Sequence, residues 1–447
     1  MQDFLTTEIA RAGLDVIKAL KARGHEAFFV GGCVRDYLLD ISVNDLDIAT
    51  SALPEEVLAI FPQSHHVGIA FGVVLVTQGQ YCFDVATFRE EGEYDDCRHP
   101  QWVKYTSAQQ DVLRRDFTIN GLLFDPTAQV ENQLIDYVQG RLDLDNRVIR
   151  TIGDPDRRFN EDALRLLRAI RFAVTKDFQL DKQTYDSICK NAHLIAKISV
   201  ERIASELNKI LLSPRRRYGI ELLMQTGLMD YIMPEVTALC GCDQSPEHHP
   251  EGDVYIHTRI MLDLLNDGSD KPTLSLIWAT LLHDIAKPLC KSVEENGRIR
   301  FFGHEALGAE VAETILKRLK YPNSLIDDVV YLVKNHMRLM NVQNVRDSKF
   351  LKWMAHPLWK EELELTRVDC ASSNGNLENY HFACEREKSS PVIKQLPTPI
   401  LNGRDLIYLG LKPGPEFKTI LEKAYDAQLD GLVETKDEAI DFLQLRH

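Results

Sequence analysis

Apolar positions along the first 125 residues alternate between helical and strand-like spacing. Residues 5–23 repeat apolar side chains with the period of an amphipathic helix, and HEAFFVGG (25–32) then reads as a short buried strand that runs into a glycine turn. Three further short segments are rich in β-branched and aromatic residues, which favour strands: DLDIAT (45–50), GVVLVTQGQ (72–80) and YCFDVATF (81–88). The pattern predicts an α/β domain built around a small sheet.

Strand-like patterning ends near Gly140, after a last hairpin predicted within residues 121–140. Helical periodicity follows in EDALRLLRAIRFAV, VERIASELNKILLS and YGIELLMQTGLMDYI, which begin at residues 161, 200 and 218. The turn-rich CGCDQSPEHHPEGD (240–253) predicts a linker, and helical patterns continue beyond it. We therefore expect an α+β chain whose second half is all-helical.

Composition and charge indicate the compartment of the protein and the kind of partner it binds. No run of about 18 apolar residues is present and the N-terminal segment is amphipathic, so we expect neither a membrane span nor a signal peptide. The nine cysteines are scattered without a CxxC pair, which is typical of reduced thiols in the cytoplasm. The net charge is −15, yet residues 141–217 carry 17 Lys and Arg against 11 Asp and Glu. Such a basic segment is typical of a nucleic-acid footprint and equally of solvated helix faces.

A pair of aspartates provides the first candidate chemistry. Asp45 and Asp47 are two residues apart on a predicted strand, so both carboxylates point to the same face. Adjacent carboxylates repel each other unless a cation lies between them, which predicts Mg²⁺ or Mn²⁺. Asp84, on a neighbouring predicted strand, is the candidate third carboxylate of a two-metal site.

A glycine turn ahead of these acids predicts a phosphate cradle. Gly31 and Gly32 leave backbone N–H groups free to approach an anion at a helix start, and Arg35 adds a charged fork one turn later. A DxD pair alone usually lies on the protein surface without a function. A phosphate cradle beside metal-binding acids indicates nucleotidyl transfer, in which the metal holds a triphosphate and pyrophosphate leaves.

Four motifs together resemble a known family. In this order, they are similar to the motifs of class II tRNA nucleotidyltransferases (CCA-adding enzymes) and the related bacterial poly(A) polymerases: GGCVRDYLL (31–39), DLDIAT (45–50), RRDFTINGLLFD (114–125) and GDPDRRFNEDALRLLRAIRFA (153–173). The resemblance implies a polymerase-β-like head with a small mixed sheet, followed by a helical neck, body and tail. It also implies that Asp45 and Asp47 hold the catalytic metal.

A second constellation concerns the choice of base. Asp162 and Arg165 are three residues apart on a predicted helix, and Arg168 continues the same stripe. An Asp that accepts from an amino group and an Arg that donates to a ring nitrogen favour cytosine and adenine over guanine and uracil. Ordinary surface ion pairs are the alternative.

The family resemblance adds roles for individual residues. It makes Asp162 and Arg165 the template for the incoming base. It assigns contacts with triphosphate or ribose, or helix packing, to a further set: Arg115, Asp116, Asn120, Arg168 and Arg171.

Three segments bear on the subtype. TFREEGEYDDCRHPQWVKY (87–105) is similar to the flexible loop that full CCA-adding enzymes use to move from C to A addition, which disfavours a CC-only enzyme and leaves an A-adding one open. HVGIAFGVVLV (66–76) stands where the poly(A) polymerases carry an arginine-rich signature, so that subtype is the weaker alternative. LSPRRRYGIELL (212–223) suits either the phosphate backbone of tRNA or a solvated charge run.

Histidines and aspartates on separate predicted helices form a third constellation. His257, the pair His283-Asp284, and Asp369 suit a divalent metal in a helical bundle. Their order resembles the HD-domain metal phosphohydrolases, and the resemblance adds two accessory ligands, His304 and His336. It implies hydrolysis of nucleotide or RNA 3′-end phosphates; the alternative is an inactive fold that has kept its ligands. His248 and His249 receive no role.

These patterns lead to one prediction for the whole chain. We expect a head at 1–140, a nucleotide-selecting and RNA-binding neck at 141–240, an HD domain at 250–375 and a helical tail at 376–447. The predicted activity is template-independent addition of C, C and A from CTP and ATP to the 3′ end of tRNA, with Mg²⁺ in the head and a divalent metal in the HD domain. An A-adding enzyme, a poly(A) polymerase, or an HD phosphohydrolase with an RNA-binding N-terminal half are the alternatives.

Overall fold

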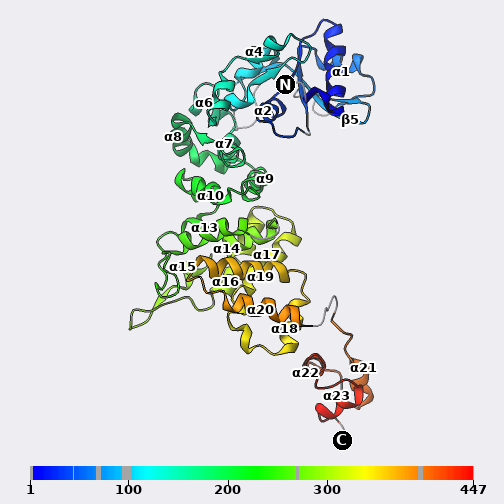
Figure 1. The fold of residues 1–447 in the computed structure, drawn as a ribbon, viewed down its shortest axis with the longest axis vertical. Coiled ribbons are helices and arrows are strands. Elements are labelled where there is room, and N and C mark those ends of the chain that lie inside the picture. The colour runs from blue at the N-terminus through cyan, green and yellow to red at the C-terminus, as the bar shows by residue number, and fades with distance from the viewer. Residues whose placement is uncertain are drawn as a thin grey trace. The chain divides into compact units, whose positions relative to one another are not determined.

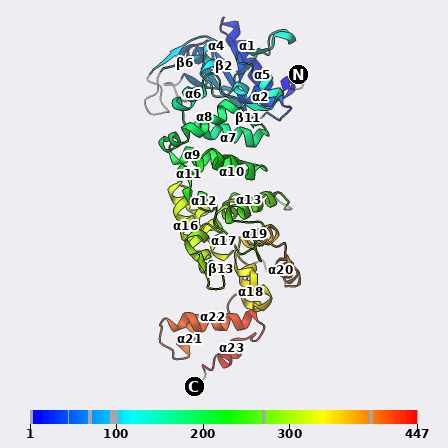
Figure 2. The same ribbon diagram turned by 90° about the vertical axis from the view of Figure 1, so that its left-hand side faces the viewer.

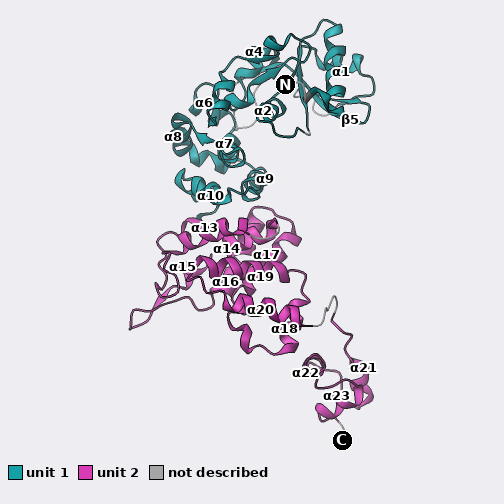
Figure 3. Cartoon of the chain, viewed as in Figure 1, with its two compact units in different colours: residues 1–234 teal, residues 235–447 magenta. Residues whose placement is uncertain are grey.

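The protein contains a sheet-bearing N-terminal part followed by a long series of helices (Figure 1). The computed structural model describes residues 4–43, 45–66, 72–92, 102–267, 271–390 and 396–445. The chain divides into two compact units, residues 1–234 and 235–447 (Figure 3). Among the described residues, the large sheet lies in unit 1, and unit 2 is helical apart from one hairpin. The predicted α+β fold is confirmed.

The sheet of unit 1 has seven strands in the order β3-β4-β5-β2-β1-β8-β9. Only the pair β2–β5 is parallel, and the other neighbouring pairs are antiparallel, so the sheet is mixed as expected. The strands are β1 Ala27–Val30, β2 Asp47–Thr50, β3 His65–His66, β4 Val73–Gln78, β5 Tyr81–Thr87, β8 Leu122–Phe124 and β9 Leu134–Asp136.

Helix α1 (Glu8–Ala22) covers the sheet with the apolar face that its sequence predicts. The side chain of Thr7 accepts a hydrogen bond from the Ala10 backbone N–H and starts the helix. Gly13 belongs to the buried face, where a β-carbon would lie 2.8 Å from Cε1 of Phe29. A larger residue at this position would therefore push the helix away from β1.

The remaining elements of unit 1 connect the sheet to a set of helices (Figure 1). The helices are η1 Phe4–Thr6, α2 Gly32–Leu38, α3 Pro54–Ile60, α4 Ala108–Leu113, η3 Thr118–Asn120, η4 Val130–Asn132, α5 Gly140–Asp145, α6 Pro155–Glu161, α7 Leu164–Lys176, α8 Lys182–Asn191, η5 Ala192–Lys197, α9 Val200–Leu211, α10 Arg216–Gln225 and α11 Leu228–Ile232. The short helix α12 Pro234–Thr237 begins at the last residue of unit 1 and continues into unit 2. Two small sheets join β6 Arg89–Glu91 to β7 Val103–Tyr105, and β10 Val148–Ile149 to β11 Gln179–Leu180.

One local prediction is wrong, and the structure bears only in part on two others. The segment EDALRLLRAIRFAV is not one helix, because α6 ends at Glu161 and α7 begins at Leu164. The polar segment 87–105 carries β6 and β7 at its ends, while residues 93–101 of the predicted flexible loop lie outside the described residues. The arginines of LSPRRR do not form one free basic run, because Arg216 is buried and donates through Nε to the Leu211 carbonyl at 2.8 Å.

Unit 2 is built around α14, in which every residue from Ser275 to Leu282 is buried. Helices α13, α17 and α19 pack against it. Its helices are α13 Val254–Leu264, η6 Leu265–Asp267, α14 Leu274–Leu282, α15 Lys287–Cys290, α16 His304–Arg318, α17 Asn323–Asn335, η7 Arg338–Asn344, α18 Asp347–Met354, α19 Trp359–Ser372, α20 Glu378–Ser389, α21 Gly403–Tyr408, α22 Glu416–Leu429 and α23 Lys436–Phe442. The hairpin joins β12 Ser292–Val293 to β13 Ile299–Arg300.

The last three helices, α21 to α23, form a separate apolar cluster. Leu401, Ala424 and Val433 belong to its core. It is tied to α18 by Asp430, whose carboxylate accepts the Ser348 backbone N–H at 2.6 Å. Within the part of the chain that the structure describes, no helix combines the length and the apolar character that crossing a bilayer requires.

Candidate functional sites

A cavity of about 760 Å³ in unit 1 brings together all the head and neck residues that the sequence singled out. Residues far apart in the chain, from the turn after β1 to the helix α7, share its lining. The predicted members are Gly31, Gly32, Arg35, Asp45, Asp47, Asp84, Arg115, Asp116, Asn120, Asp162, Arg165, Arg168 and Arg171.

The three aspartates lie at the sheet because β2 and β5 run parallel in a register that pairs Asp47 with Asp84. Register partners point to the same face, so Asp47 and Asp84 do so. The prediction that Asp45 lies on the same strand is wrong, because β2 begins at Asp47 and Asp45 stands in the segment before it. Desolvation by the surrounding protein, together with the charges of Asp45 and Asp84, raises the pKa of Asp47 to about 6, against the opposing effect of Arg115. This excess of negative charge fits a divalent cation with oxygen ligands.

The acids of the head are nevertheless loosely gathered. All three side chains are exposed. Among the described residues, the groups of three whose ligand atoms lie within 4.8 Å of one another do not include them. The head therefore offers an open, acidic surface for a cation rather than a closed cage.

The glycine turn between β1 and α2 allows a close approach of charged groups. Gly31 has a φ of 72°, and a β-carbon there would lie 3.2 Å from Nη1 of Arg115. Arg35 is buried beneath this turn, where it donates to Asn120 Oδ1 at 2.6 Å and to both carboxylate oxygens of Asp36 at 2.9 Å. Arg35 thus braces the turn, and Arg115 is the arginine beside Gly31.

Asp116 joins the segment RRDFTIN to helix α7. Its Oδ2 accepts from Nε and Nη2 of Arg168 at 2.9 and 2.6 Å, and its Oδ1 accepts from Asn120 Nδ2 at 3.0 Å. Although burial alone would raise it, the Arg168 charge and these hydrogen bonds hold the pKa of Asp116 well below its usual range. Asp116 is therefore ionised and fixes the arginine stripe of α7 at the cavity.

Asp162 and Arg165 are neighbours at the break between α6 and α7 rather than on one helix face. Asp162 has extended backbone angles, and its Oδ1 accepts the Leu164 backbone N–H at 3.0 Å. Arg165 donates to the carbonyls of Arg158 and Arg114, and to Glu161 Oε2. These bonds use three of its five N–H donors. Two donors remain for a ligand beside an Asp acceptor.

Two residues of α9 that were not among the predicted site residues hold this region. Arg202 donates to Asp162 Oδ2 at 3.0 Å, and Glu206 lies 2.8 Å from Nε of Arg171. Burial, together with the neighbouring Arg168, lowers the pKa of Arg171 to about 10, against the effect of Glu206. The spacing of Arg202 and Glu206, one helical turn apart in VERIASEL, is the signal that could have identified this face.

A cavity of about 450 Å³ in unit 2 contains the second predicted site. Asp284, His304, His336 and Asp369 line it, and His257 and His283 lie buried behind them. Among the described residues, three groups have all their ligand atoms within 4.8 Å: His257, His283 and Asp284; Asp284, His304 and His336; and His249, Glu251 and His257. The first two consist of predicted ligands only. Asp369 joins the first group, because its Oδ1 lies 3.2 Å from Nε2 of His257. All six predicted residues therefore converge.

The imidazoles of this cluster are oriented by their outer nitrogens. Nδ1 of His283, His304 and His336 faces the backbone carbonyls of Thr280, Phe301 and Val333 at 2.9, 2.8 and 2.7 Å. Nδ1 of His257 faces Glu251 Oε1 at 2.8 Å. Such contacts leave Nε2 directed to the centre, which is how histidine is held when it binds a metal.

The unsatisfied atoms of the cluster also fit a metal. Nε2 of His257 and His283 and both oxygens of Asp284 are buried without a hydrogen-bond partner within the described residues. Although burial lowers it, Asp369 and Glu251 raise the pKa of His257 to about 9. The cluster therefore attracts a cation, and its mixed nitrogen and oxygen donors suit a divalent transition metal.

The segment 240–253 is more than the linker that its turns predicted. Glu251 Oε1 faces Nδ1 of both His257 and His249 at 2.8 Å, so this segment covers and orients the histidine cluster. Lys287, which the sequence analysis also missed, lies 2.7 Å from Asp284 Oδ2 and donates to Gln244 Oε1 at 2.7 Å. The Asp284 carboxylate is therefore contacted by the Lys287 ammonium as well as by imidazole groups of the cluster.

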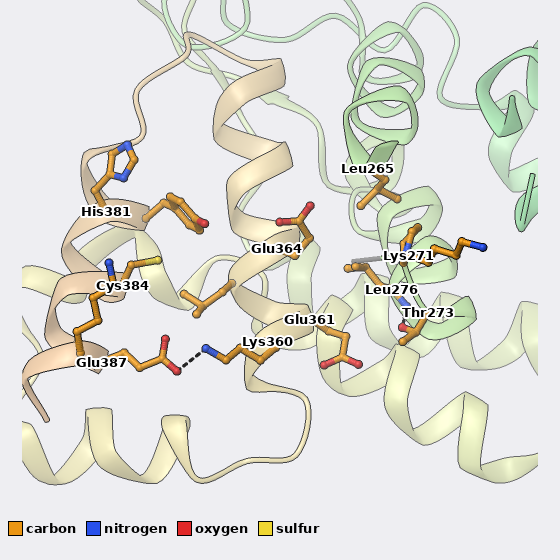
Figure 4. Close-up of a pocket in the computed structure, with 14 residues that line it drawn as sticks. Leu265, Lys271, Thr273, Leu276, Lys360, Glu361, Glu364, His381, Cys384 and Glu387 are labelled. Atoms are coloured by element: carbon orange, nitrogen blue, oxygen red, sulfur yellow. Dashed lines mark hydrogen bonds and ion pairs between the residues drawn. The ribbon is translucent and has the colours of Figure 1, made fainter. Parts of the chain in front are cut away.

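A larger cavity of unit 2, about 740 Å³, lies where α14, α19 and α20 meet and has a different character (Figure 4). Its charged side chains include the ion pair between Lys360 and Glu387, at 2.6 Å. None of the predicted ligands or nucleotide-binding residues lines it. Size alone therefore does not identify a site here.

Comparison with known families agrees with the two sites. The poly A polymerase head domain matches residues 27–150, the probable RNA and SrmB-binding site of polymerase A matches 177–240, and the HD domain matches 254–370. The chain thus matches both predicted families, with the polymerase head before the HD domain, in the predicted order.

Individual relatives cover nearly the whole chain. The CCA-adding enzyme of Anoxybacillus flavithermus is 33% identical over 434 residues, which is 96% of this chain and 95% of the relative. That of Streptococcus gordonii is 46% identical over 220 residues, 49% of this chain and 54% of the relative. The crystal structure of the Bacillus stearothermophilus CCA-adding enzyme in complex with CTP has a TM-score of 0.70 and 29% identity, with 98% of each chain covered. The chain therefore belongs to the family of CCA-adding enzymes, tRNA nucleotidyltransferases with a polymerase-type head.

Proposed function

We propose that this protein adds C, C and A to the 3′ end of tRNA, using CTP and ATP and releasing pyrophosphate. One observation carries the proposal: the three aspartates of the sheet share a cavity with the Asp162–Arg165 pair and with the arginines of α7. Relatives that align over almost the whole chain are CCA-adding enzymes, and a similar structure holds CTP. A cytoplasmic location, where tRNA and nucleoside triphosphates meet, suits these substrates.

In this proposal, the aspartates of the head bind the metal and the arginines bind the triphosphate. Asp45 and Asp47, with Asp84 beside them, would hold Mg²⁺, which when bound supplies a Lewis acid for the triphosphate and the attacking 3′ hydroxyl. Arg115 neutralises phosphate charge next to the Gly31 turn. Arg168, oriented by Asp116, and Arg171, oriented by Glu206, extend the positive surface along α7.

Base choice falls to Asp162 and Arg165. The Asp162 carboxylate accepts from the amino group of cytosine or adenine, and a remaining N–H of Arg165 donates to the ring nitrogen beside it. Guanine and uracil place a carbonyl and a ring N–H at these positions, so they leave both protein groups unsatisfied. No nucleic-acid template is needed for this selection.

Domain boundaries follow from the same proposal. We place the head at 1–140, the neck at 141–240, the HD domain at 250–375 and the tail at 376–447. The family matches at 27–150, 177–240 and 254–370 support this division.

A second activity is proposed for the HD domain: hydrolysis of a phosphate ester at the cluster of His257, His283, Asp284, Asp369, His304 and His336. The convergence of all six side chains supports it, together with the unsatisfied buried atoms at their centre. These residues would hold one or more divalent cations, whose role when bound is to supply a nucleophile from water.

A single set of assays tests both activities. Full-length protein is given tRNA that lacks CCA, or that already carries C or CC, with labelled CTP or ATP. Growth of all three ends supports CCA addition, growth of the CC end alone with ATP supports an A-adding enzyme, and unlimited A addition supports a poly(A) polymerase. Incorporation that survives Asp45→Ala would refute the transferase, and phosphate release that survives His283→Ala would refute the HD activity.

A further inference from the structure

The hairpin β12–β13 of unit 2 (labelled β13 in Figure 2) contributes Ile299 and Arg300 to the lining of the HD cavity. Phe302, two residues after the hairpin, also lines the cavity and is 76% exposed. A large ring left in water loses the stabilisation that burial would give. A phenylalanine that both lines a cavity and faces solvent is suited to be covered by a ligand.

One end of the cavity is suited to phosphate. Lys287 is buried, and its ammonium lies 2.7 Å from Asp284 Oδ2 and 5.3 Å from the centre of the Phe301 ring. It is therefore a fixed positive charge next to the predicted metal ligands. Phosphate oxygens that reach the metal cluster would meet this charge as well.

Other parts of the lining are suited to a nucleoside. The Arg300 guanidinium lies 5.8 Å from the centre of the Phe302 ring and is held by Glu294 Oε1 at 3.1 Å. Asn374 and Asn376 also line the cavity, and each uses its Oδ1 to accept a backbone N–H. Each can therefore offer its NH₂ group as a donor to a base carbonyl or ring nitrogen.

The size of the cavity agrees with a ligand larger than phosphate. Its volume of about 450 Å³ falls within the range of about 300 to 1,000 Å³ that is typical of small-molecule sites. Aromatic rings, arginine planes and amide groups are the side chains that proteins use to bind unstacked bases.

We propose that Phe302 and Arg300 are specificity-determining residues of the HD site, with Phe302 stacking on the base of a nucleoside phosphate ester. The ester would place its phosphate at Lys287 and the cluster of predicted metal ligands, while the base lies against Phe302 and the hairpin. This inference rests on the HD phosphohydrolase proposed above. The same chemistry is presented by a free nucleotide and by the last nucleoside of an RNA that ends in a phosphate.

The test compares three substrates in full-length protein: adenosine 3′-monophosphate, a short RNA with a 3′-terminal phosphate, and glycerol 2-phosphate, which has no base. Phosphate release gives kcat/KM for each, and inhibition of glycerol 2-phosphate turnover by adenosine gives a binding readout for the nucleoside alone. Phe302→Ala should lower the preference for the adenosine ester over glycerol 2-phosphate about tenfold and weaken inhibition by adenosine by a similar factor. Phe302→Trp should restore both.

Phe442→Ala, which removes another exposed phenylalanine far along the chain in α23, is the matched control and should keep both values. A Phe302→Ala protein that keeps the wild-type preference and adenosine inhibition would overturn the inference while leaving the HD activity in place. If the wild-type protein releases phosphate from none of the three substrates, the HD proposal and this inference both fall. A loss confined to the RNA or to the free nucleotide identifies which of the two the hairpin binds.

Discussion

The two candidate sites of this protein are built in opposite ways. In the head, Asp45, Asp47 and Asp84 are exposed, and the nearby arginines are paired with protein groups. In the HD domain the six predicted ligands are at most 8% exposed, and the outer nitrogens of the four imidazoles are already engaged. The difference teaches that the head is completed by its substrates, whereas the HD centre is assembled before any ligand arrives.

The strongest test of an open head site is removal of one strand acid. Asp47→Ala should lower nucleotide incorporation into tRNA by about a thousandfold or more, because the charge that holds the metal is lost. Primer extension with labelled ATP measures the effect. Asp230→Ala, at an exposed acid of α11 outside the cavity, should retain normal incorporation; equal losses in both variants would refute a special role of the strand acids.

A preassembled HD centre should fail when one central ligand is removed. His283→Ala should abolish bound divalent metal and phosphate release while tRNA extension continues, because the two sites lie in separate units. Metal analysis of the purified protein and the two activity assays measure this. The exposed His193 provides the control, and a His283→Ala protein with full metal content would contradict the predicted ligand set.

The contact that orients a ligand of the HD centre from outside should have a smaller effect than the ligand itself. Glu251→Gln should weaken metal affinity about 10- to 100-fold, since the carboxylate that orients His257 loses its charge. Competition with a metallochromic chelator gives the affinity. Glu247→Gln, four residues earlier and exposed, should have the affinity of the wild type.

An analogous positioning contact exists in the head. Arg202→Gln should reduce the preference for ATP over GTP about tenfold, because Asp162 loses the guanidinium that holds its Oδ2. The ratio of kcat/KM values for the two nucleotides measures the preference, and a simple loss of stability would lower both values equally. Arg11→Gln, on the exposed face of α1, should leave the ratio unchanged.

The smallest effect concerns the stability of the head and its dependence on pH. Asp116→Asn should lower the melting temperature of unit 1 by about 5 °C at pH 7, because Arg168 loses its ionised partner. Folding lowers the pKa of Asp116 well below its usual range, so its stabilising effect is complete above the unfolded value of about 3.9 and is lost gradually as the pH falls from there through the folded pKa. Melting curves from pH 7 to 3 should therefore show a difference between the two proteins that is constant down to about pH 4 and only begins to narrow below it.

Much of both sites followed from short-range rules. The strand prediction is right for Asp47, which the parallel strands pair with Asp84, whereas Asp45 lies just before β2 rather than on it. The histidine cluster followed from residue types in a known order, although its ligands come from five different helices, with His283 and Asp284 both at the end of α14. The mixed sheet and the helical second half followed from apolar periodicity.

Contacts between distant segments were not predictable in the same way. The break at Asp162 opposes a helical sequence pattern, and the residues beside it are held by contacts from distant segments, such as the hydrogen bond from Arg165 to the carbonyl of Arg114. The role of Glu251 in orienting His257 becomes apparent only when its turn-rich segment has folded against this histidine. Arg216 has the composition of a surface residue, yet tertiary packing buries it against the Leu211 carbonyl.

The parallel pairing of β2 and β5 has an evolutionary consequence. Parallel neighbours must be joined by a crossover, here residues 51–80, while the separation of Asp47 and Asp84 is set by the hydrogen-bonded ladder. The exposed turn at Gly79 can thus gain or lose residues across species without displacing either acid. A change in the number of residues at this turn is therefore compatible with an unchanged arrangement of the two acids. Related proteins can differ in length here, and a reporter peptide can be inserted at the same place.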